Sequence, residues 1–283
     1  MSIIIKTLNY QGIEIFTKGF SGGERHIQLQ NMPKDTPLSL NLRCYVHNSE
    51  DLMDLLLFRD AINNHYKTIV PMNLELPYLP YARQDRVCAK GQAFSLQVFS
   101  TILHTLNLKH LTIWDCHSQI GTQLTGAVNI EATEIIDSCS PLKEKIQDKE
   151  SVLICPDKGA ILRCQEVVDY FNLKPMIKSE KVRNPTTGKI THTDVHATDL
   201  TGKTAIITDD ICDGGYTFIK IAEQLKLKNV NKIILYVTHG IFSKGLSVFD
   251  GLIDEIYTTQ SFPQQDHKKL HVINFNSNLG EIS

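Results

Sequence analysis

The chain has 283 residues, of which 42% are hydrophobic, so it can bury two cores of ordinary size. Its formal net charge of -2 argues against a surface that binds nucleic acid. No apolar run approaches the roughly 20 residues that cross a bilayer, and the first ten residues lack the basic and long apolar regions of a signal peptide. The seven cysteines include no C-x-x-C pair, which predicts a reduced, cytoplasmic protein without a disulfide framework or zinc site.

The N-terminal part begins with short β-like runs and a loop that carries an aromatic residue and an acid. Strands are predicted at residues 3–5, 13–16, 26–30 and 38–45. The loop between the second and third contains Phe20 and Glu24. A loop phenylalanine can stack on a nucleotide base or fill a gap in a core, and the local sequence is compatible with both. A helix then begins at Ser49, the predicted N-cap, with Glu50 and Asp51 in its first turn.

Two loops in the first half follow predicted strands and carry polar side chains. The strand at residues 72–76 leads through two prolines to Arg83, Gln84 and Asp85, before a helix at residues 95–106. Such a cationic loop can grip a polyphosphate or be a solvated connection. The strand at residues 110–114 is followed by His117, at the place where open α/β sheets bind ligands. A structural histidine is equally compatible with that position.

The second half repeats the alternation of strand and helix. A strand at residues 151–155 leads to the loop with Asp157 and a helix at residues 160–170, and another strand covers residues 174–177. The polar segment 178–189, which includes Lys181 and Arg183, is too rich in helix and strand breakers for a core element. It predicts a mobile hairpin that brings cations to a charged intermediate, or else an ordinary solvated hairpin.

The stretch from Thr204 to Leu225 carries the most chemistry. A buried strand at residues 205–208 leads into a loop with three aspartates and two glycines, and then into a helix. The start of a helix offers free backbone N–H groups to an anion, whereas the carboxylates suit hydroxyls or a cation. A sugar phosphate satisfies both; in the alternative interpretation, Asp213 and the glycines only cap the helix.

Strands at residues 232–237, 253–258 and 270–274 complete the pattern. The alternation predicts an α/β fold with largely parallel sheets flanked by helices. The pattern is interrupted between residues 138 and 150, which include a charged run. Two domains are therefore predicted, an N-terminal one over residues 1–140 and a C-terminal one over residues 141–283.

Six loop motifs occur in an order and spacing that resemble those of the ribose-phosphate pyrophosphokinases, also called PRPP synthetases. They are LPYLPYARQDR, WDCHSQIG, CPDKGA, KVR, TDDICDGGYT and VTHGIFS. The resemblance runs from about Phe20 to Asn274. It implies two phosphoribosyltransferase-like (type I) domains. It also implies a magnesium-dependent enzyme that transfers the β,γ-diphosphoryl group of ATP to the anomeric 1-hydroxyl of a ribose 5-phosphate moiety and releases AMP.

The resemblance assigns the sugar-phosphate site to the loop and helix start after residue 208. Three carboxylates would hold the ribose hydroxyls and their metal shell, and backbone amides with one hydroxyl would cradle the 5-phosphate. The matching positions are Asp209, Asp210, Asp213, Gly214, Gly215, Tyr216 and Thr217. His117 and Asp157 match the family's metal-linked positions.

The remaining matches concern ATP and catalysis. Arg83, Gln84 and Asp85 match the ATP-binding segment, whereas Phe20 and Glu24 match residues that touch adenine from a neighbouring subunit, which implies a homo-oligomer. Lys181 and Arg183 match the flexible-loop cations that stabilise charge on the transferred group. Such a transfer depends on in-line positioning and on cations around the equatorial oxygens more than on an acid or base.

The chain also departs from the family's pattern. The phosphate loop has lost a threonine, and the bulky Tyr216 replaces a glycine that lets backbone approach a phosphate dianion. We therefore expect an acceptor with an esterified 5-phosphate, ADP-ribose, as in the branch that makes ADP-ribose pyrophosphate for NAD salvage. Free ribose 5-phosphate is the conservative alternative. The run Val87–Gly91 has few cations, so feedback by phosphate and ADP is in doubt, and the family's opening βα unit is missing before Phe20.

Two other classes of protein compete with the synthetase. A non-catalytic regulatory relative would lose part of the set Lys181, Arg183, His117 and Asp157, and all four are present. A phosphoribosyltransferase that consumes the activated sugar would share the Asp209–Asp210 loop, but it would need neither the ARQD segment nor the Lys181 flap.

Overall fold

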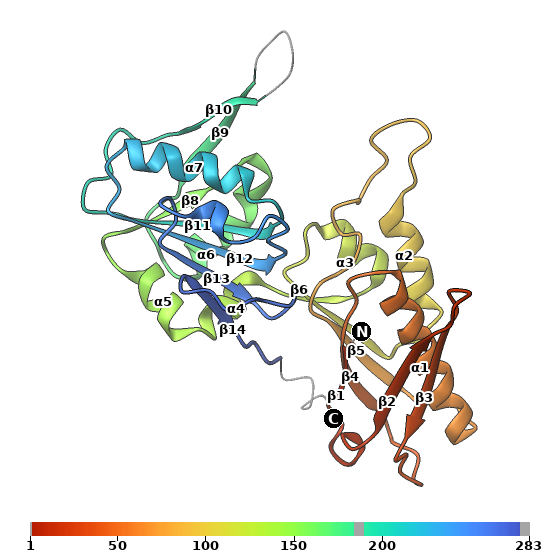
Figure 1. Cartoon of the computed structure of the whole chain (residues 1–283). Helices are drawn as coiled ribbons and strands as arrows, with labels where there is room; N and C mark the ends of the chain where they lie inside the picture. The colour runs from red at the N-terminus through yellow and green to blue at the C-terminus, as the bar shows by residue number, and fades with distance from the viewer. Residues whose placement is uncertain (1, 184–189, 278–283) are drawn as a thin grey trace. The chain divides into compact units, whose positions relative to one another are not determined.

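The computed structural model describes residues 2–183 and 190–277 and divides into two compact units (Figure 1). The N-terminal unit comprises Met1–Ile130 together with the C-terminal residues from Asn276, and the C-terminal unit comprises Glu131–Phe275. The division falls ten residues before the predicted end of the first domain at residue 140. The reason is that the strand ending at Ile130 pairs within the first sheet, whereas the helix after it packs on helices of the second unit.

The N-terminal unit is built on a five-stranded sheet of order β1-β4-β5-β6-β7. β1 is antiparallel to β4, and the other pairs are parallel. The strands are β1 (Ser2–Ile5), β4 (Leu40–Tyr45), β5 (Met72–Leu76), β6 (His110–Trp114) and β7 (Val128–Ile130). The helices are α1 (Ser49–Tyr66), α2 (Ser95–His104) and α3 (Gln119–Thr125), with a 3-10 turn at Leu8–Tyr10. β5 and β6 have the bounds that the sequence predicted.

Helix α1 begins as predicted at Ser49, but its predicted N-cap was wrong. Its N-cap is Asn48, in an extended conformation, and not Ser49, because the Asn48 side chain accepts a hydrogen bond from the Asp51 backbone N at 2.9 Å. The buried side chains Leu55, Phe58 and Ile62 recur at helical spacing, and they pack into the core of this unit.

A two-stranded hairpin, β2 (Glu14–Gly19) and β3 (Arg25–Gln30), lies outside the main sheet. Arg25 fixes it to α1 because its guanidinium donates to both carboxylate oxygens of the buried Asp54, at 2.9 and 2.5 Å. Such a bidentate ion pair constrains orientation as well as distance. The tip of this hairpin carries Phe20 and Glu24, so their backbone is held by a rigid support.

A buried ionic cluster lies under the carboxyl ends of β4 and β5. Arg43 donates to Glu75 through Nε at 2.6 Å and through Nη2 at 3.2 Å, and both residues are almost fully buried. Trp114 Nε1 donates to the same carboxylate at 2.7 Å. The C-terminal segment joins the cluster, since Asn276 Oδ1 accepts from Arg43 at 3.3 Å and the Ser277 hydroxyl donates to Glu75. These contacts explain why the end of the chain belongs to the N-terminal unit.

The C-terminal unit is built on a seven-stranded sheet of order β10-β9-β8-β11-β12-β13-β14. All neighbouring pairs are parallel except β9 with β10. The strands are β8 (Ser151–Cys155), β9 (Ile177–Arg183), β10 (Ile190–Val195), β11 (Thr204–Cys212), β12 (Lys232–Gly240), β13 (Glu255–Thr259) and β14 (Leu270–Ile273). The helices are α4 (Ala132–Asp137), α5 (Ser140–Gln147), α6 (Ile161–Tyr170) and α7 (Tyr216–Leu227), with 3-10 turns at Lys158–Ala160 and Ser247–Phe249.

Two strands of this sheet differ from the prediction. β9 begins at Ile177, where the predicted strand was to end, and continues into the polar segment because its backbone pairs antiparallel with β10. β9 and β10 are therefore antiparallel neighbours, and residues 184–189 between them lie outside the described residues. β11 extends past Thr208 to Cys212, so Asp209 and Asp210 belong to a strand and not to a loop. Pairing with β12 through Cys212 explains the extra length.

The predicted fold class, α/β with mostly parallel sheets flanked by helices, is confirmed in both units. None of the described helices combines the length and apolar character that crossing a membrane requires.

The buried cluster around Glu75 generates a stability prediction. Glu75→Ala leaves the Arg43 guanidinium buried without its carboxylate, and we expect a loss of about 3–5 kcal/mol of unfolding free energy. Trp114 is the one tryptophan of the chain and touches Glu75, so its fluorescence during urea titration reports unfolding of this unit. The exposed Asp60→Ala is the matched control and should change stability by less than about 0.5 kcal/mol. Equal stabilities of the two variants would contradict the prediction.

Candidate active site

The carboxyl ends of three parallel strands gather most of the predicted site residues of the C-terminal unit. β11 pairs with β8 on one side and β12 on the other, so the segments after Cys155, Cys212 and Gly240 emerge at one edge of the sheet. Ligands of open α/β sheets bind at this edge. The loops CPDKGA, TDDICDGGYT and VTHGIFS, which are far apart in the sequence, therefore meet at this edge.

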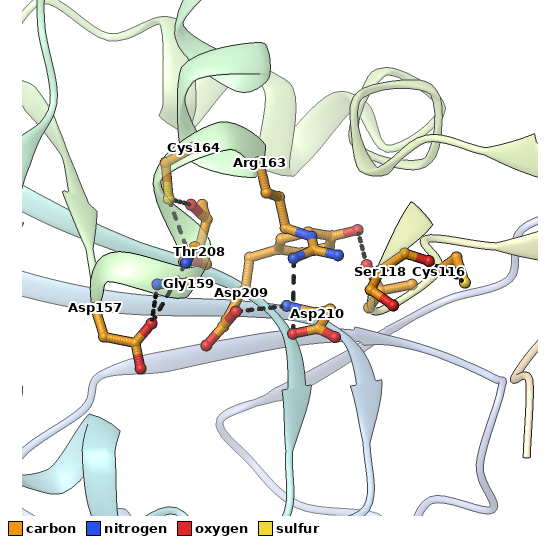
Figure 2. Close-up of polar contacts among 12 residues, drawn as sticks. Cys116, Ser118, Asp157, Gly159, Arg163, Cys164, Thr208, Asp209 and Asp210 are labelled. Atoms are coloured by element: carbon orange, nitrogen blue, oxygen red, sulfur yellow. Dashed lines mark hydrogen bonds and ion pairs between the residues drawn. The ribbon is translucent and has the colours of Figure 1, made fainter. Parts of the chain in front are cut away.

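Asp209 and Asp210 form the polar centre of this edge (Figure 2). Asp209 Oδ1 accepts a hydrogen bond from the Asp210 backbone N at 3.0 Å. Asp210 is 4% exposed, and its carboxylate lies 3.8 Å from the Arg163 guanidinium of α6. The Arg163 guanidinium therefore lies beside two adjacent acids.

The electrostatics of the pair follow from this geometry. Burial and the neighbouring Asp210 charge raise the pKa of Asp209 well above its usual value, against the smaller opposing effects of Arg163 and the Asp210 N–H. A strongly perturbed carboxylate at the edge of a parallel sheet is typical of a functional site. A cation or a hydroxyl-rich ligand bound there would relieve the repulsion.

The loop from Asp213 to Gly215 leads into helix α7, and its last position requires glycine. Gly215 is the N-cap, with φ of +78°, and a Cβ at this position would lie 2.6 Å from Phe249 Cζ. A glycine thus caps the helix, as the alternative interpretation of this loop expected, and the capping role that it gave to Asp213 stays a prediction. Asp213 Oδ1 accepts from the Ser243 hydroxyl at 2.6 Å, which ties this loop to the loop after β12.

Tyr216 and Thr217, which belong to the predicted phosphate cradle, occupy the first turn of α7. The Tyr216 side chain is 57% exposed, and Lys220 Nζ lies 5.7 Å from the centre of its ring. The bulky residue that replaces the family's glycine thus faces solvent from the start of the helix and does not fill the core.

Asp157 lies directly after β8 and has a structural task. Its Oδ1 accepts hydrogen bonds from the backbone N atoms of Gly159 and Ala160, at 2.9 and 3.3 Å, and so caps a 3-10 turn (Figure 2). His117, the other predicted metal-linked residue, follows β6 in the N-terminal unit. Among residues 2–183 and 190–277, no group of three or more His, Cys, Asp or Glu side chains is arranged to hold a metal ion. The metal role of both residues remains a prediction.

Two residues of α6 at this edge were not predicted. Arg163 approaches Asp210, and the Cys164 thiol contacts the hydroxyl of Thr208, the residue before Asp209, at 3.3 Å (Figure 2). Neither belongs to a motif, and the sequence marks them only as members of the helix that follows CPDKGA. Their contacts depend on how α6 packs against β8 and β11.

The predicted catalytic cations are located by backbone alone. Lys181 and Arg183 lie in β9, in register with Thr193 and Ile190 of β10. Their side chains lie outside the described residues. Their assignment to catalysis therefore stays a prediction.

In the N-terminal unit, the segment predicted to bind ATP lies near Ser118 and His117. Asp85 is 5% exposed and accepts from Arg86 Nε at 3.0 Å. Burial alone would raise the pKa of Asp85, but the nearby Ser118 hydroxyl, Arg86 and His117 outweigh it and lower that pKa. Two motifs that the sequence could only place in separate loops are therefore adjacent at the carboxyl ends of β5 and β6.

Phe20 and Glu24 face each other across the tip of the β2–β3 hairpin. The Phe20 backbone N donates to the Glu24 carbonyl at 2.9 Å. The Phe20 ring is 50% exposed, with Lys18 Nζ 5.1 Å from its centre. Half of this aromatic ring is thus available to a ligand or partner, and the core-plug alternative is not what the structure shows.

Comparison with known proteins supports the motif analysis. Residues 127–258 match the family described as "Phosphoribosyl transferase domain". The ribose-phosphate pyrophosphokinase of Mycoplasmopsis pulmonis is 29% identical over 242 residues, 83% of this chain and 73% of that protein. That of Thermococcus kodakarensis is 29% identical over 255 residues, 89% of this chain and 86% of that protein. The chain therefore resembles the ribose-phosphate pyrophosphokinases over most of its length, as the loop motifs predicted.

The structural comparison concerns the fold of the family. The crystal structure of phosphoribosylpyrophosphate synthetase from Mycobacterium smegmatis matches with a TM-score of 0.77 at 20% identity, covering 92% of this chain and 85% of that one. The predicted pair of phosphoribosyltransferase-like domains is thus confirmed, and so is the prediction of an enzyme, since the relatives' shared name is that of a pyrophosphokinase.

The raised pKa of Asp209 predicts that the free energy of unfolding depends on pH. The folded protein keeps a proton on Asp209 above the ordinary aspartate pKa of about 4, so its stability falls as pH rises from there towards the folded-state pKa. Asp209→Asn keeps the oxygen that accepts from Asp210 N but removes this cost. We expect the variant to be more stable at pH 8, by on the order of 1 kcal/mol, and similar to wild type near pH 4.

Thermal melts by far-UV circular dichroism, with a chelator present, measure this difference. The exposed Asp194→Asn should follow the wild type at every pH. A stability gap for Asp209→Asn that does not grow with pH would contradict the assigned repulsion.

Proposed function

We propose that this protein transfers the β,γ-diphosphoryl group of ATP to the anomeric hydroxyl of a ribose 5-phosphate moiety and releases AMP. The observation that carries the proposal is the Asp209–Asp210 pair near the start of α7, where Gly215 is the N-cap. Carboxylates accept hydrogen bonds from sugar hydroxyls, and a helix N-terminus favours a phosphate. The agreement with named pyrophosphokinases over more than four fifths of the chain supports the same reaction.

The atoms and charges of this reaction balance without a dedicated acid or base from the protein. The anomeric oxygen attacks the β-phosphorus, a new O–P bond forms, and the bond between that phosphorus and the bridging oxygen to the α-phosphorus breaks. AMP leaves with the bridging oxygen, and the hydroxyl proton is lost to solvent. Catalysis then consists of positioning and of charge stabilisation, which we assign to Lys181 and Arg183.

The ATP side of the reaction is assigned to the N-terminal unit. Arg83, Gln84 and Asp85 would bind the nucleotide, with Asp85 held in its ionised form. Phe20 and Glu24 would touch adenine of a neighbouring subunit in a cytoplasmic homo-oligomer. The half-exposed Phe20 ring on a hairpin anchored by the Arg25–Asp54 pair suits such a contact.

The residues at the sugar site fit the magnesium ion that the family implies. Mg²⁺ is bound through one or two carboxylates together with substrate phosphates, and it keeps several waters. Asp209 and Asp210 supply two adjacent carboxylates, and the charge of Asp210 raises the pKa of Asp209. His117 and Asp157 are the further candidates. When bound, the ion neutralises charge on the phosphate oxygens.

For the acceptor we propose ADP-ribose, which would give ADP-ribose pyrophosphate in NAD salvage. Tyr216 stands at the first position of α7 with 57% of its side chain exposed, where the family has a glycine. An aromatic side chain there restricts close approach of a phosphate dianion and offers a surface to a larger group attached to the phosphate. Ribose 5-phosphate is the second candidate, because the relatives are named for ribose phosphate.

A coupled assay of AMP release tests both the reaction and the acceptor. With ATP and Mg²⁺ present, we expect kcat/KM for ADP-ribose to exceed that for ribose 5-phosphate by roughly tenfold, or about 1.4 kcal/mol. Tyr216→Gly should reduce this ratio because it restores space for a terminal phosphate. If the enzyme uses ribose 5-phosphate and not ADP-ribose, the preferred acceptor is wrong. If neither sugar leads to release of AMP, the proposed diphosphokinase reaction is wrong.

Variants of the β9 cations test the assigned catalysis. Lys181→Ala with Arg183→Ala should lower kcat by about 10²–10³ because the transferred group loses two stabilising charges, whereas ATP affinity should change little. Lys178→Ala, an exposed lysine on the same strand, is the matched control. Rapid-quench single-turnover kinetics and equilibrium ATP binding separate the two effects. Weakened binding with unchanged single-turnover rate would contradict the role.

A further inference from the structure

A cavity of 490 Å³ lies in the C-terminal unit, between the loop that follows β12 and the loop that follows β13. β12 and β13 are parallel neighbours, so both loops emerge at the same edge as the sugar-phosphate loop after β11 (Figure 1). This volume is within the range of pockets that bind small organic ligands. No residue of the proposed reaction lines it.

One wall of the cavity is bonded directly to the sugar-phosphate loop. Ser243 lines the cavity, its hydroxyl donates to Asp213 Oδ1 at 2.6 Å, and its backbone N donates to the Asp213 carbonyl at 3.1 Å. The next residue, Lys244, places its Cγ 3.6 Å from the point where a Cβ on Gly214 would lie. A ligand phosphate beyond the first one would therefore meet a hydroxyl and a flexible cation on its way from the phosphate loop to the cavity.

The other wall carries groups that suit a nucleoside. Gln265 and Asp266 are exposed and His267 is half-buried, and all three line the cavity. Amide side chains recognise the hydrogen-bonding edge of a base, aromatic rings stack on its face, and a carboxylate accepts from ribose hydroxyls. A carboxylate in this wall disfavours an inorganic anion as the occupant, whereas it suits the uncharged adenosine end of a dinucleotide.

The frame of the cavity is rigid. Gln264 Nε2 donates to the Gly240 carbonyl at 2.8 Å and to the Phe262 carbonyl at 3.1 Å, which joins the two loops. The Phe242 ring packs against Gly240, where a Cβ would lie 2.2 Å from Phe242 Cε2, and meets Phe249 edge-on at 6.3 Å. Preformed walls reduce the entropy lost when a ligand is ordered.

We propose that this cavity holds the adenosine of ADP-ribose, with the second phosphate of its diphosphate beside Ser243 and Lys244. The proposal rests on the proposed function, because it requires the ribose 5-phosphate end to lie at Asp209, Asp210 and α7. Under this proposal, the loops that follow β12 and β13 determine the preferred acceptor together with Tyr216. Free ribose 5-phosphate, which has no nucleoside, would leave the cavity unused.

The two acceptors supply the experiment with an internal control. The double variant Gln265→Ala, Asp266→Ala removes exposed side chains and should leave the fold intact. We expect its KM for ADP-ribose to rise about tenfold, from the loss of polar contacts, and its KM for ribose 5-phosphate to stay within about twofold of wild type. Lys268→Ala, which removes a neighbouring exposed side chain that does not line the cavity, should change neither value. Calorimetric titration with ADP-ribose gives the same comparison without turnover.

Three outcomes would overturn the assignment, and they can be told apart. If wild-type protein turns over ribose 5-phosphate but neither binds nor uses ADP-ribose, the preferred acceptor fails and the cavity assignment fails with it. If wild type uses ADP-ribose and the double variant does so equally well, only the cavity assignment fails. If the variant loses affinity for both sugars to the same degree, the two side chains act on the shared sugar-phosphate loop and the cavity does not hold adenosine.

Discussion

Parallel pairing of β11 between β8 and β12 is the constraint on which the candidate active site depends. It brings three loops from separate parts of the chain to one edge and sets Asp209 and Asp210 into the last, paired part of a strand. Acids in a strand have less freedom to move apart than acids in a loop. Burial and the resulting repulsion raise the pKa of Asp209.

In the N-terminal unit, ion pairs hold the segments that carry the predicted site residues. Arg25 with Asp54 anchors the hairpin that carries Phe20, and Arg43 with Glu75 anchors the carboxyl ends of β4 and β5. Both acids are fully buried and paired, so their cost of desolvation is offset by geometry. Asp209 and Asp210 differ from these two acids because they lie side by side and the charge of one raises the pKa of the other.

The start of α7 combines a residue fixed by packing with one that packing leaves free. Gly215 is required by its positive φ and by the Phe249 ring, so packing within this chain fixes the shape of the loop backbone. Tyr216 is exposed and free of such a requirement, and the adjoining cavity is lined by exposed polar side chains. The shape of the phosphate loop and the choice of acceptor can therefore change independently, which is how a common reaction can be directed to a different sugar.

The sequence by itself determined the α/β class, most strand positions and the family, because hydrophobic periodicity and glycine-rich loops are local signals. Strands β5, β6 and β8 were predicted to the residue. Only the tertiary structure decided the length of β11, the hydrogen bond of Ser243 to Asp213 and the approach of Arg163 to Asp210. These features join residues 30 or more positions apart, or depend on strand pairing, and no local pattern encodes which distant partner will satisfy a carboxylate.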